Sequence, residues 1–258
     1  MNIDFHTHVK ISKKTKFLPE YFQEMIKEAK LAGLDAIALT EHFNTINFMD
    51  VYDYLDDNFP YQEDYYLVED VKIFPGIEVD VKETGHILLI GQRESILSIF
   101  EELRPHLDRT NFIPFADLMD LAESYDVIKI GGHPFRPNTP LTQHDPNQLK
   151  RLDALDLNGK DLHSIGIEKN QENVYCFAEK LGIPVVAGSD THQFLQYSSV
   201  LNILEYDCST ISELKTAIQN KAYSIQISSD LHLRVRSASL TKKLIKNLLE
   251  SEDKLIVG

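Results

Sequence analysis

The 258-residue chain has few cysteines, no tryptophan and no long apolar run, and these absences exclude several classes of protein. Its two cysteines, Cys176 and Cys208, are far apart, which argues against a disulfide framework and favours a reducing compartment. No apolar run approaches the roughly 18 residues of a membrane-spanning helix. The first residues, MNIDFHTHVK, also lack the apolar core of a signal peptide. We therefore expect a soluble, cytoplasmic protein that does not bind membranes.

An excess of basic residues is also absent. The chain has 26 Lys and Arg residues against 40 Asp and Glu residues, which gives a net charge of −14. This charge argues against a protein that holds nucleic acid or an anionic membrane by overall electrostatic attraction. It leaves room for a local basic pocket, so a nucleotide or a short oligonucleotide is favoured over a duplex.

Short apolar segments of strand length alternate along the chain with longer amphipathic segments. Residues 35–42 are nearly all apolar until their polar end, as expected for a strand that is covered on both faces. Residues 18–33 show the apolar spacing of a helix. This alternation predicts an α/β fold with mainly parallel strands. One hairpin is expected between segments 71–81 and 86–91, because only the polar turn KETG separates them.

The length of the chain fits one α/β barrel. We predict a single domain over residues 1–258, in which residues from about 205 to 258 form a strand–helix extension. The acidic and aromatic segment 45–66 is interpreted as an insertion or a lid.

Six of the ten histidines stand at the ends of predicted strands. In parallel α/β barrels the carboxyl ends of the strands meet at one face, where active sites are built. The polar residues at these ends are His6, His8, His42, Glu78, His86, His133, Asp190 and His192. Imidazole and carboxylate ligands without thiolate suit Zn²⁺, Mn²⁺ or Fe²⁺. Eight ligands exceed the needs of one tetrahedral ion, so we predict two or three divalent ions, with the two oxygens of Glu78 as the natural bridge.

Five motifs, in the order DFHTH, TEH, PGIEVDVKETGHILLIG, GGHP and GSDTH, resemble those of the PHP (polymerase and histidinol phosphatase) superfamily. The similarity runs from residue 2 to about residue 230 and includes the segment LDALDLNG, residues 152–159. It implies a distorted seven-stranded (β/α) barrel, similar to a TIM barrel, with a site of two or three metal ions that hydrolyses phosphoesters.

The resemblance also implies which residues bind each ion. The first set is His6, His8, Glu78 and Asp190, the second is Glu78, His86 and His133, and the third is His42 and His192. Lys14 stands roughly where the family usually has an Asp or His that completes the third site, so the occupancy of that site stays open. Lys14 is instead a candidate ligand of the substrate phosphate. Glu41 replaces the Asp that is common before the TEH histidine.

Together these features predict a phosphatase or phosphoesterase that uses metal-activated water to hydrolyse a small phosphorylated metabolite or nucleotide. Arg136 is the candidate phosphate clamp, because guanidinium matches phosphate oxygens. His42 and His192 are candidate proton donors to the leaving oxygen where they bind no metal. We expect Asp4 to hold a ligand histidine by a hydrogen bond.

Two alternatives remain at this point. The same activated water could attack a carbonyl carbon, as in an amidohydrolase. Lys14 gives modest support to a non-catalytic, metal-binding regulatory module, against which the eight intact ligand positions argue. The motifs leave the substrate, the metal and the oligomeric state open.

Overall fold

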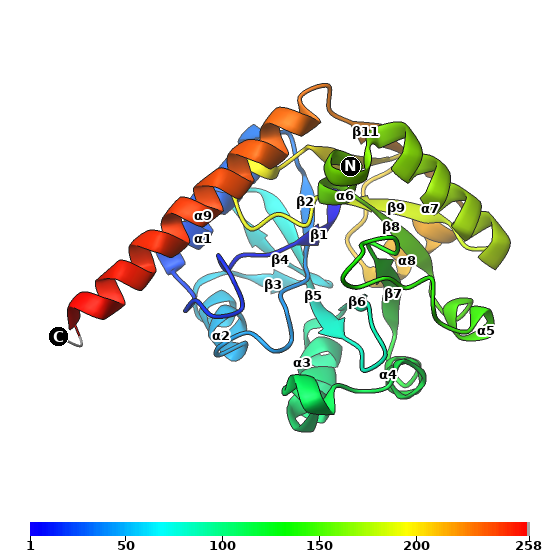
Figure 1. Cartoon of the computed structure of the whole chain (residues 1–258), viewed down its shortest axis with the longest axis horizontal. Coiled ribbons are helices and arrows are strands. Elements are labelled where there is room, and N and C mark those ends of the chain that lie inside the picture. The colour runs from blue at the N-terminus through cyan, green and yellow to red at the C-terminus, as the bar shows by residue number, and fades with distance from the viewer. Residues whose placement is uncertain (257–258) are drawn as a thin grey trace.

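A strongly curved sheet forms the centre of the computed structural model, which describes residues 1–256 and, up to residue 248, their side chains (Figure 1). Seven strands follow one another around a nearly closed barrel: β1 (Asn2–Thr7), β2 (Ala36–Leu39), β5 (Val71–Asp80), β6 (His86–Gly91), β7 (Val127–Gly132), β8 (Ala154–Asn158) and β9 (Val185–Gly188). The predicted distorted α/β barrel is confirmed.

One strand of the barrel runs against the others. β6 pairs antiparallel with both β5 and β7, whereas β1–β2, β2–β5, β7–β8 and β8–β9 are parallel pairs. Only residues 81–85 join β5 to β6, which is too short for the crossover that a parallel pair needs. The predicted hairpin is therefore confirmed. Its direction brings His86, the first residue of β6, to the barrel mouth where the parallel strands end.

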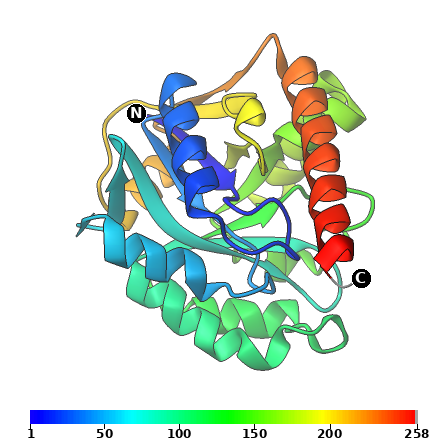
Figure 2. The same ribbon diagram turned by 90° about the vertical axis from the view of Figure 1, so that its left-hand side faces the viewer.

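Helices cover the outside of the barrel (Figures 1 and 2). They are α1 (Pro19–Leu31), α2 (Met49–Asn58), α3 (Arg93–Leu103), α4 (Phe115–Ala122), α5 (Pro146–Leu149), α6 (Gly159–Ile165), α7 (Ile167–Leu181), α8 (Ile211–Gln219) and α9 (Leu231–Ile256), with short 3₁₀ helices η1 (Arg104–His106), η2 (Arg109–Asn111) and η3 (Phe194–Gln196). No helix within the described residues is long and apolar enough to cross a membrane.

Segment 45–66 forms α2, β3 (Tyr61–Gln62) and the start of β4 (Tyr65–Val68), which pairs with β5. The Tyr52 side chain is buried, and its hydroxyl donates a hydrogen bond of 2.8 Å to the carbonyl of Gly76 on β5. The prediction of a lid is wrong, because the aromatic residues anchor this segment in the core.

The extension after β9 adds β10 (Val200–Leu204) and β11 (Tyr223–Ile227) to the sheet. β10 pairs antiparallel with β1, and β11 pairs antiparallel with β10. Leu214 and Ala217 of α8 pack with inward-facing apolar residues of the barrel such as Leu88 and Ile130. One end of the barrel is therefore filled by apolar side chains, and polar groups collect at the other end.

A buried amide side chain bridges the first and last strands of the barrel, and the backbone N–H of Asp190 also donates to the carbonyl of His6 at 2.8 Å. Oδ1 of Asn202 on β10 accepts a hydrogen bond of 2.8 Å from the backbone N–H of Ala187 on β9. Its Nδ2 donates to the carbonyls of Ala187, at 2.8 Å, and of Ile3 on β1, at 3.0 Å. Asn202 therefore closes the seam between β1 and β9.

Substituting Asn202 by Ala is expected to destabilise the fold. The change leaves three buried backbone groups without a partner, at a cost of about 1–3 kcal/mol per group, so the free energy of unfolding should fall by at least about 3 kcal/mol. Urea denaturation measures this loss. The control is Asn147→Ala at an exposed position, which should change stability by less than about 0.5 kcal/mol. Equal stability of the two variants would contradict the role of the seam.

Candidate metal centre

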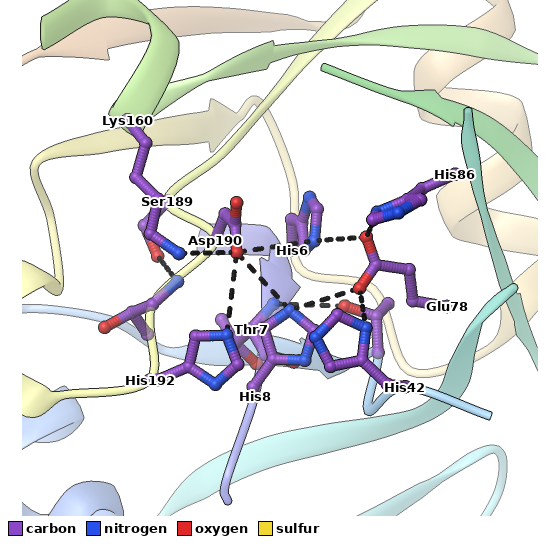
Figure 3. A network of polar contacts seen from close by, with 12 residues as sticks. His6, Thr7, His8, His42, Glu78, His86, Lys160, Ser189, Asp190 and His192 are labelled. Atoms are coloured by element: carbon purple, nitrogen blue, oxygen red, sulfur yellow. Dashed lines mark hydrogen bonds and ion pairs between the residues drawn. The ribbon is translucent and has the colours of Figure 1, made fainter. Parts of the chain in front are cut away.

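The eight residues singled out by the sequence meet at the polar mouth of the barrel, with Glu78 among them. Figure 3 labels all of them except His133. Five imidazoles surround the Glu78 carboxylate, at 2.5 Å for His42 Nδ1, 2.6 Å for His86 Nδ1, 3.5 Å for His6 Nε2, 3.5 Å for His8 Nε2 and 3.6 Å for His133 Nε2. Glu78 follows Phe74 and Gly76 on the inward face of β5, so the alternation of the strand places its side chain inside the barrel.

A second carboxylate, Asp190, faces the same imidazoles from the loop after β9. Its Oδ1 lies 3.5 Å from His8 Nε2 and 4.0 Å from the Nε2 atoms of both His6 and His192. Residues 6 and 8 both reach this carboxylate, as their i, i+2 spacing predicts. The pairing of β1 with β2 is irregular between Asp4 and Thr7, and this irregularity interrupts the alternation that Ile3 and Phe5 begin.

The ligand atoms form three groups, and within each group the atoms lie within 4.8 Å of one another. They are His6, His8 and Asp190; Glu78, His86 and His133; and His8, His42 and His192. This grouping resembles the three predicted sets, except that His8 also joins the third group and Glu78 is absent from the first. Their role as ligands stays a prediction.

Hydrogen bonds at Nδ1 orient two of the imidazoles, those of His6 and His192, and leave their Nε2 atoms to face the site. His6 Nδ1 lies 2.9 Å from the carboxylate of Asp156 on β8, while its buried Nε2 has no hydrogen-bond partner. The Nδ1–H of His192 donates a hydrogen bond of 2.8 Å to the carbonyl of Lys10. Histidines that bind metal ions are typically held in this way. Because a buried polar atom without a partner is costly, these residues fit divalent cations.

The charges of the site favour metal binding at neutral pH. Burial opposes ionisation of Glu78, but the neighbouring His42 and His86 lower the pKa of Glu78 well below its usual value. Lys160 and Arg136 likewise hold the pKa of Asp190 well below its usual value against the effect of burial. Burial lowers the pKa of His192 far below its usual value. Ionised carboxylates and neutral imidazoles are the forms that bind metal ions.

His6 has the opposite shift. Burial alone would lower its pKa, but Asp190 and Glu78 raise the pKa of His6 to about 10. The negative potential that raises the pKa of His6 would also attract a cation, so protons and cations compete at these carboxylates.

The loops that carry two of these residues adopt an unfavourable backbone conformation. His133 has φ of 32° and Asp190 has φ of 57°, values that non-glycine residues adopt rarely. Gly188, two residues before Asp190, allows the close approach of β9 to β1, because a Cβ atom there would lie 2.2 Å from His6 Cβ. Such strain is typical of functional sites.

Arg136, the predicted phosphate clamp, lies beside Asp190. Its Nη2 is 2.9 Å from Asp190 Oδ2 and 2.9 Å from Asn158 Oδ1, and its Nε donates to Asp161 Oδ1 at 2.9 Å. These contacts engage the guanidinium within the protein and favour a role in positioning Asp190.

Near His86 the structure places Lys13, and not the Lys14 that the sequence singled out. Lys14 is exposed, whereas the Nζ of its neighbour Lys13 lies 2.6 Å from Asp80 Oδ2. Asp80 in turn lies 2.8 Å from His86 Nε2. Lys13 therefore holds Asp80, and Asp80 holds the ring of His86 at the nitrogen that does not face Glu78.

Sequence reasoning missed Asp156 and Lys160, and Asp4 bonds a predicted ligand histidine, His6, through its backbone. Asp4 Oδ1 accepts hydrogen bonds from the backbone N–H groups of His6, at 3.1 Å, and Ser189, at 2.9 Å, and from no imidazole. Asp156, which stands at the polar end of the segment LDALDLNG, is the residue that orients His6. Its position at a strand end is the one signal that could have identified it.

Comparison with known proteins gives a sequence match and several shared folds. Residues 4–129 match the PHP domain. The structure is similar to PsfC from Pseudomonas syringae PB-5123, with a TM-score of 0.78 and 22% identity over 95% of this chain and 98% of that chain. It is also similar to the lesion-specific endonuclease PfuEndoQ from Pyrococcus furiosus, with a TM-score of 0.63 and 18% identity over 87% of this chain and 58% of that chain.

An amidohydrolase from Chromobacterium violaceum, crystallised with bound SO4 and no metal, has a TM-score of 0.52 and 14% identity over 84% of this chain and 96% of that chain. At these identities the solved structures show a common fold. No curated protein matches the chain in sequence. The matched residues include the first three of the five motifs, and the barrel brings all five to one mouth. The match covers just under half of the chain and makes residues 4–129 similar to the PHP domain family.

Proposed function

We propose that this chain is a metal-dependent hydrolase that cleaves the phosphoester bond of a small phosphorylated molecule. The observation that supports this most strongly is the gathering of six imidazoles around two ionised carboxylates, with buried nitrogen atoms that have no hydrogen-bond partner. The set of eight residues suits two or three divalent ions, and its nitrogen and oxygen ligands favour zinc, manganese or iron.

Divalent ions bound there would supply an activated water near neutral pH and would neutralise the phosphate oxygens. The residues of the chain would keep the ligands in place: Asp156 orients His6, the carbonyl of Lys10 orients His192, and Arg136 holds Asp190. Burial lowers the pKa of His42 to about 4, so its imidazole is neutral at pH 7. The low pKa values of His42 and His192 therefore favour ligand roles over proton donation.

A nucleic-acid phosphodiester is the second candidate substrate. The endonuclease Q fold was also solved in complex with a 27-mer duplex substrate that has an abasic lesion at the active site. The net charge of −14 opposes binding of a long duplex to this chain. A nucleotide or a short single strand is consistent with both observations.

Substituting Glu78 by Gln tests the centre of the site. The change keeps the shape of the side chain but removes the charge that five imidazoles surround. We expect the bound metal to fall by at least one ion per chain and hydrolysis of p-nitrophenyl phosphate to fall more than about 100-fold, beyond the effect of a typical outer-sphere substitution. Elemental analysis and steady-state kinetics measure the two effects, with Glu205→Gln at an exposed position as the control. Full metal content and activity in Glu78→Gln would refute the site.

The Asp156→Asn variant tests the orientation of His6. Loss of the carboxylate weakens the hydrogen bond at Nδ1, so metal affinity should fall about 10–100-fold while the fold is retained. Competition with a chromophoric chelator measures this affinity. Asp117→Asn, at an exposed position of α4, should bind metal as the unmodified protein does. An unchanged affinity in Asp156→Asn would show that His6 needs no such support.

Removal and replacement of the metal tests the reaction class. A strong chelator should abolish hydrolysis, and Mn²⁺ or Zn²⁺ should restore it. The panel contains p-nitrophenyl phosphate, a 5′-phosphorylated tetranucleotide and an N-acyl amide. Hydrolysis of the amide alone would replace phosphoester cleavage by amidohydrolase chemistry. Tightly bound metal with no turnover of any substrate would favour the non-catalytic module.

A further inference from the structure

A lysine of α6 contacts the metal centre, and two lysines of α9 stand next to it along the helix that packs on α6. α9 packs against both α6 and η3, the segments that follow β8 and the loop of His192. Lys160 lies in the first turn of α6, and Lys242 and Lys246 stand one helical turn apart on α9. Three lysines therefore stand close to one another at the α6–α9 contact, in a chain whose net charge is −14.

Lys160 connects this group to the proposed metal ligands. Its Nζ lies 2.8 Å from Asp190 Oδ1, and Figure 3 shows its side chain reaching toward that carboxylate. The same carboxylate is near the Nε2 atoms of His6 and His8, where a cation would bind. A cation there would compete with the Lys160 ammonium for Asp190, which would leave the ammonium available to an anion.

Lys242 and Lys246 line a cavity of about 360 Å³ together with Ser239, Lys243 and Asn247. Like charges four residues apart on a helix repel each other, so this pair lowers the stability of α9. Within the described side chains, up to residue 248, no carboxylate forms an ion pair with either lysine. The cavity is therefore lined by positive charge that the described part of the chain does not neutralise.

The charge of Lys242 is coupled to the metal centre. Burial and the neighbouring Lys160 lower the pKa of Lys242 to about 7, while Asp190 raises it in part. Lys242 therefore lies within electrostatic reach of Lys160, Asp190 and Lys246, and it shares the cavity on α9 with Lys246. A solvated lysine of an ordinary surface would have neither this burial nor these neighbours. A bound anion would offset both the burial and the repulsion.

We propose that Lys160, Lys242 and Lys246 bind a second phosphate group of the substrate, beside the phosphate that is cleaved at the metal centre. The inference rests on the proposed phosphoesterase function and narrows its substrates to molecules with at least two neighbouring phosphates. A bisphosphorylated small molecule and a short oligonucleotide share this chemistry, because each presents a further phosphate near the reacting one. Ammonium groups bind such anions by charge-assisted hydrogen bonds.

The test compares one-phosphate and two-phosphate substrates in the double variant Lys242→Met/Lys246→Met. Methionine keeps the aliphatic length of the side chain and removes the charge, and the thermal unfolding midpoint checks that the variant folds. The probes are p-nitrophenyl phosphate, fructose 1,6-bisphosphate and a 5′-phosphorylated tetranucleotide. We expect the KM of a two-phosphate probe, relative to that of p-nitrophenyl phosphate, to rise at least about 10-fold, with a smaller effect on kcat. Lys180→Met, on the exposed face of α7, should leave this ratio unchanged.

The probe whose KM rises identifies the source of the second phosphate, the bisphosphorylated sugar or the oligonucleotide. An unchanged KM ratio for both probes would overturn the proposal even if the enzyme is an active phosphoesterase.

A binding measurement separates this proposal from the proposed function. Calorimetry on the metal-loaded protein compares pyrophosphate with orthophosphate, without any need for turnover. We expect tighter binding of pyrophosphate, and loss of this preference in the double variant. Lysine-dependent binding without hydrolysis of any probe would contradict the phosphoesterase and leave the anion site standing. Equal binding of the two anions to the unmodified protein would overturn the anion site.

Discussion

The rest of the structure depends on one constraint, the burial of the Glu78 carboxylate among five imidazoles. Five imidazoles approach one carboxylate within 3.6 Å inside a protein, away from bulk water. Burying such polar groups is costly unless each finds a partner. Several nitrogen atoms of the site have no hydrogen-bond partner. The fold therefore holds ready a set of ligands that divalent cations would stabilise.

Other parts of the barrel keep these groups from moving apart. Apolar residues of α8 fill the opposite end, and the Asn202 amide fixes β1 to β9 at the seam between His6 and Asp190. The buried Glu41 carboxylate accepts hydrogen bonds from the backbone N–H groups of Lys10 and His42, both at 3.0 Å, which fixes two loops at the mouth. The left-handed backbone of His133 and Asp190 persists because these contacts hold the surrounding chain.

The sequence was most informative at the ends of the strands, where an apolar segment stops at polar residues. Polar residues at the ends of apolar strands identified all eight residues that meet at the mouth, and the short KETG turn identified the antiparallel strand. Contacts between distant segments were harder to foresee. Asp156 differs from any other strand-end carboxylate only by lying 2.9 Å from His6, and Lys242 joins the site only because α9 folds back onto α6. Segment 45–66 is acidic and aromatic and was interpreted as an insertion or a lid, whereas the structure buries Tyr52, Tyr65 and Tyr66 in the core.

The net charge of −14 and the lysines beside the site act over different distances. At physiological ionic strength, charges in solvent are screened beyond roughly 8 Å, so acidic groups on distant surfaces contribute little at the mouth of the barrel. Partly buried groups such as Lys160 and Lys242 are screened much less, because protein replaces water around them. A long duplex would extend over the acidic surface, whereas a small polyanion would meet only the local field. The charge distribution therefore selects for the size of an anionic ligand as well as for its charge, and this selection is consistent with both the acidic composition and a phosphate-binding site.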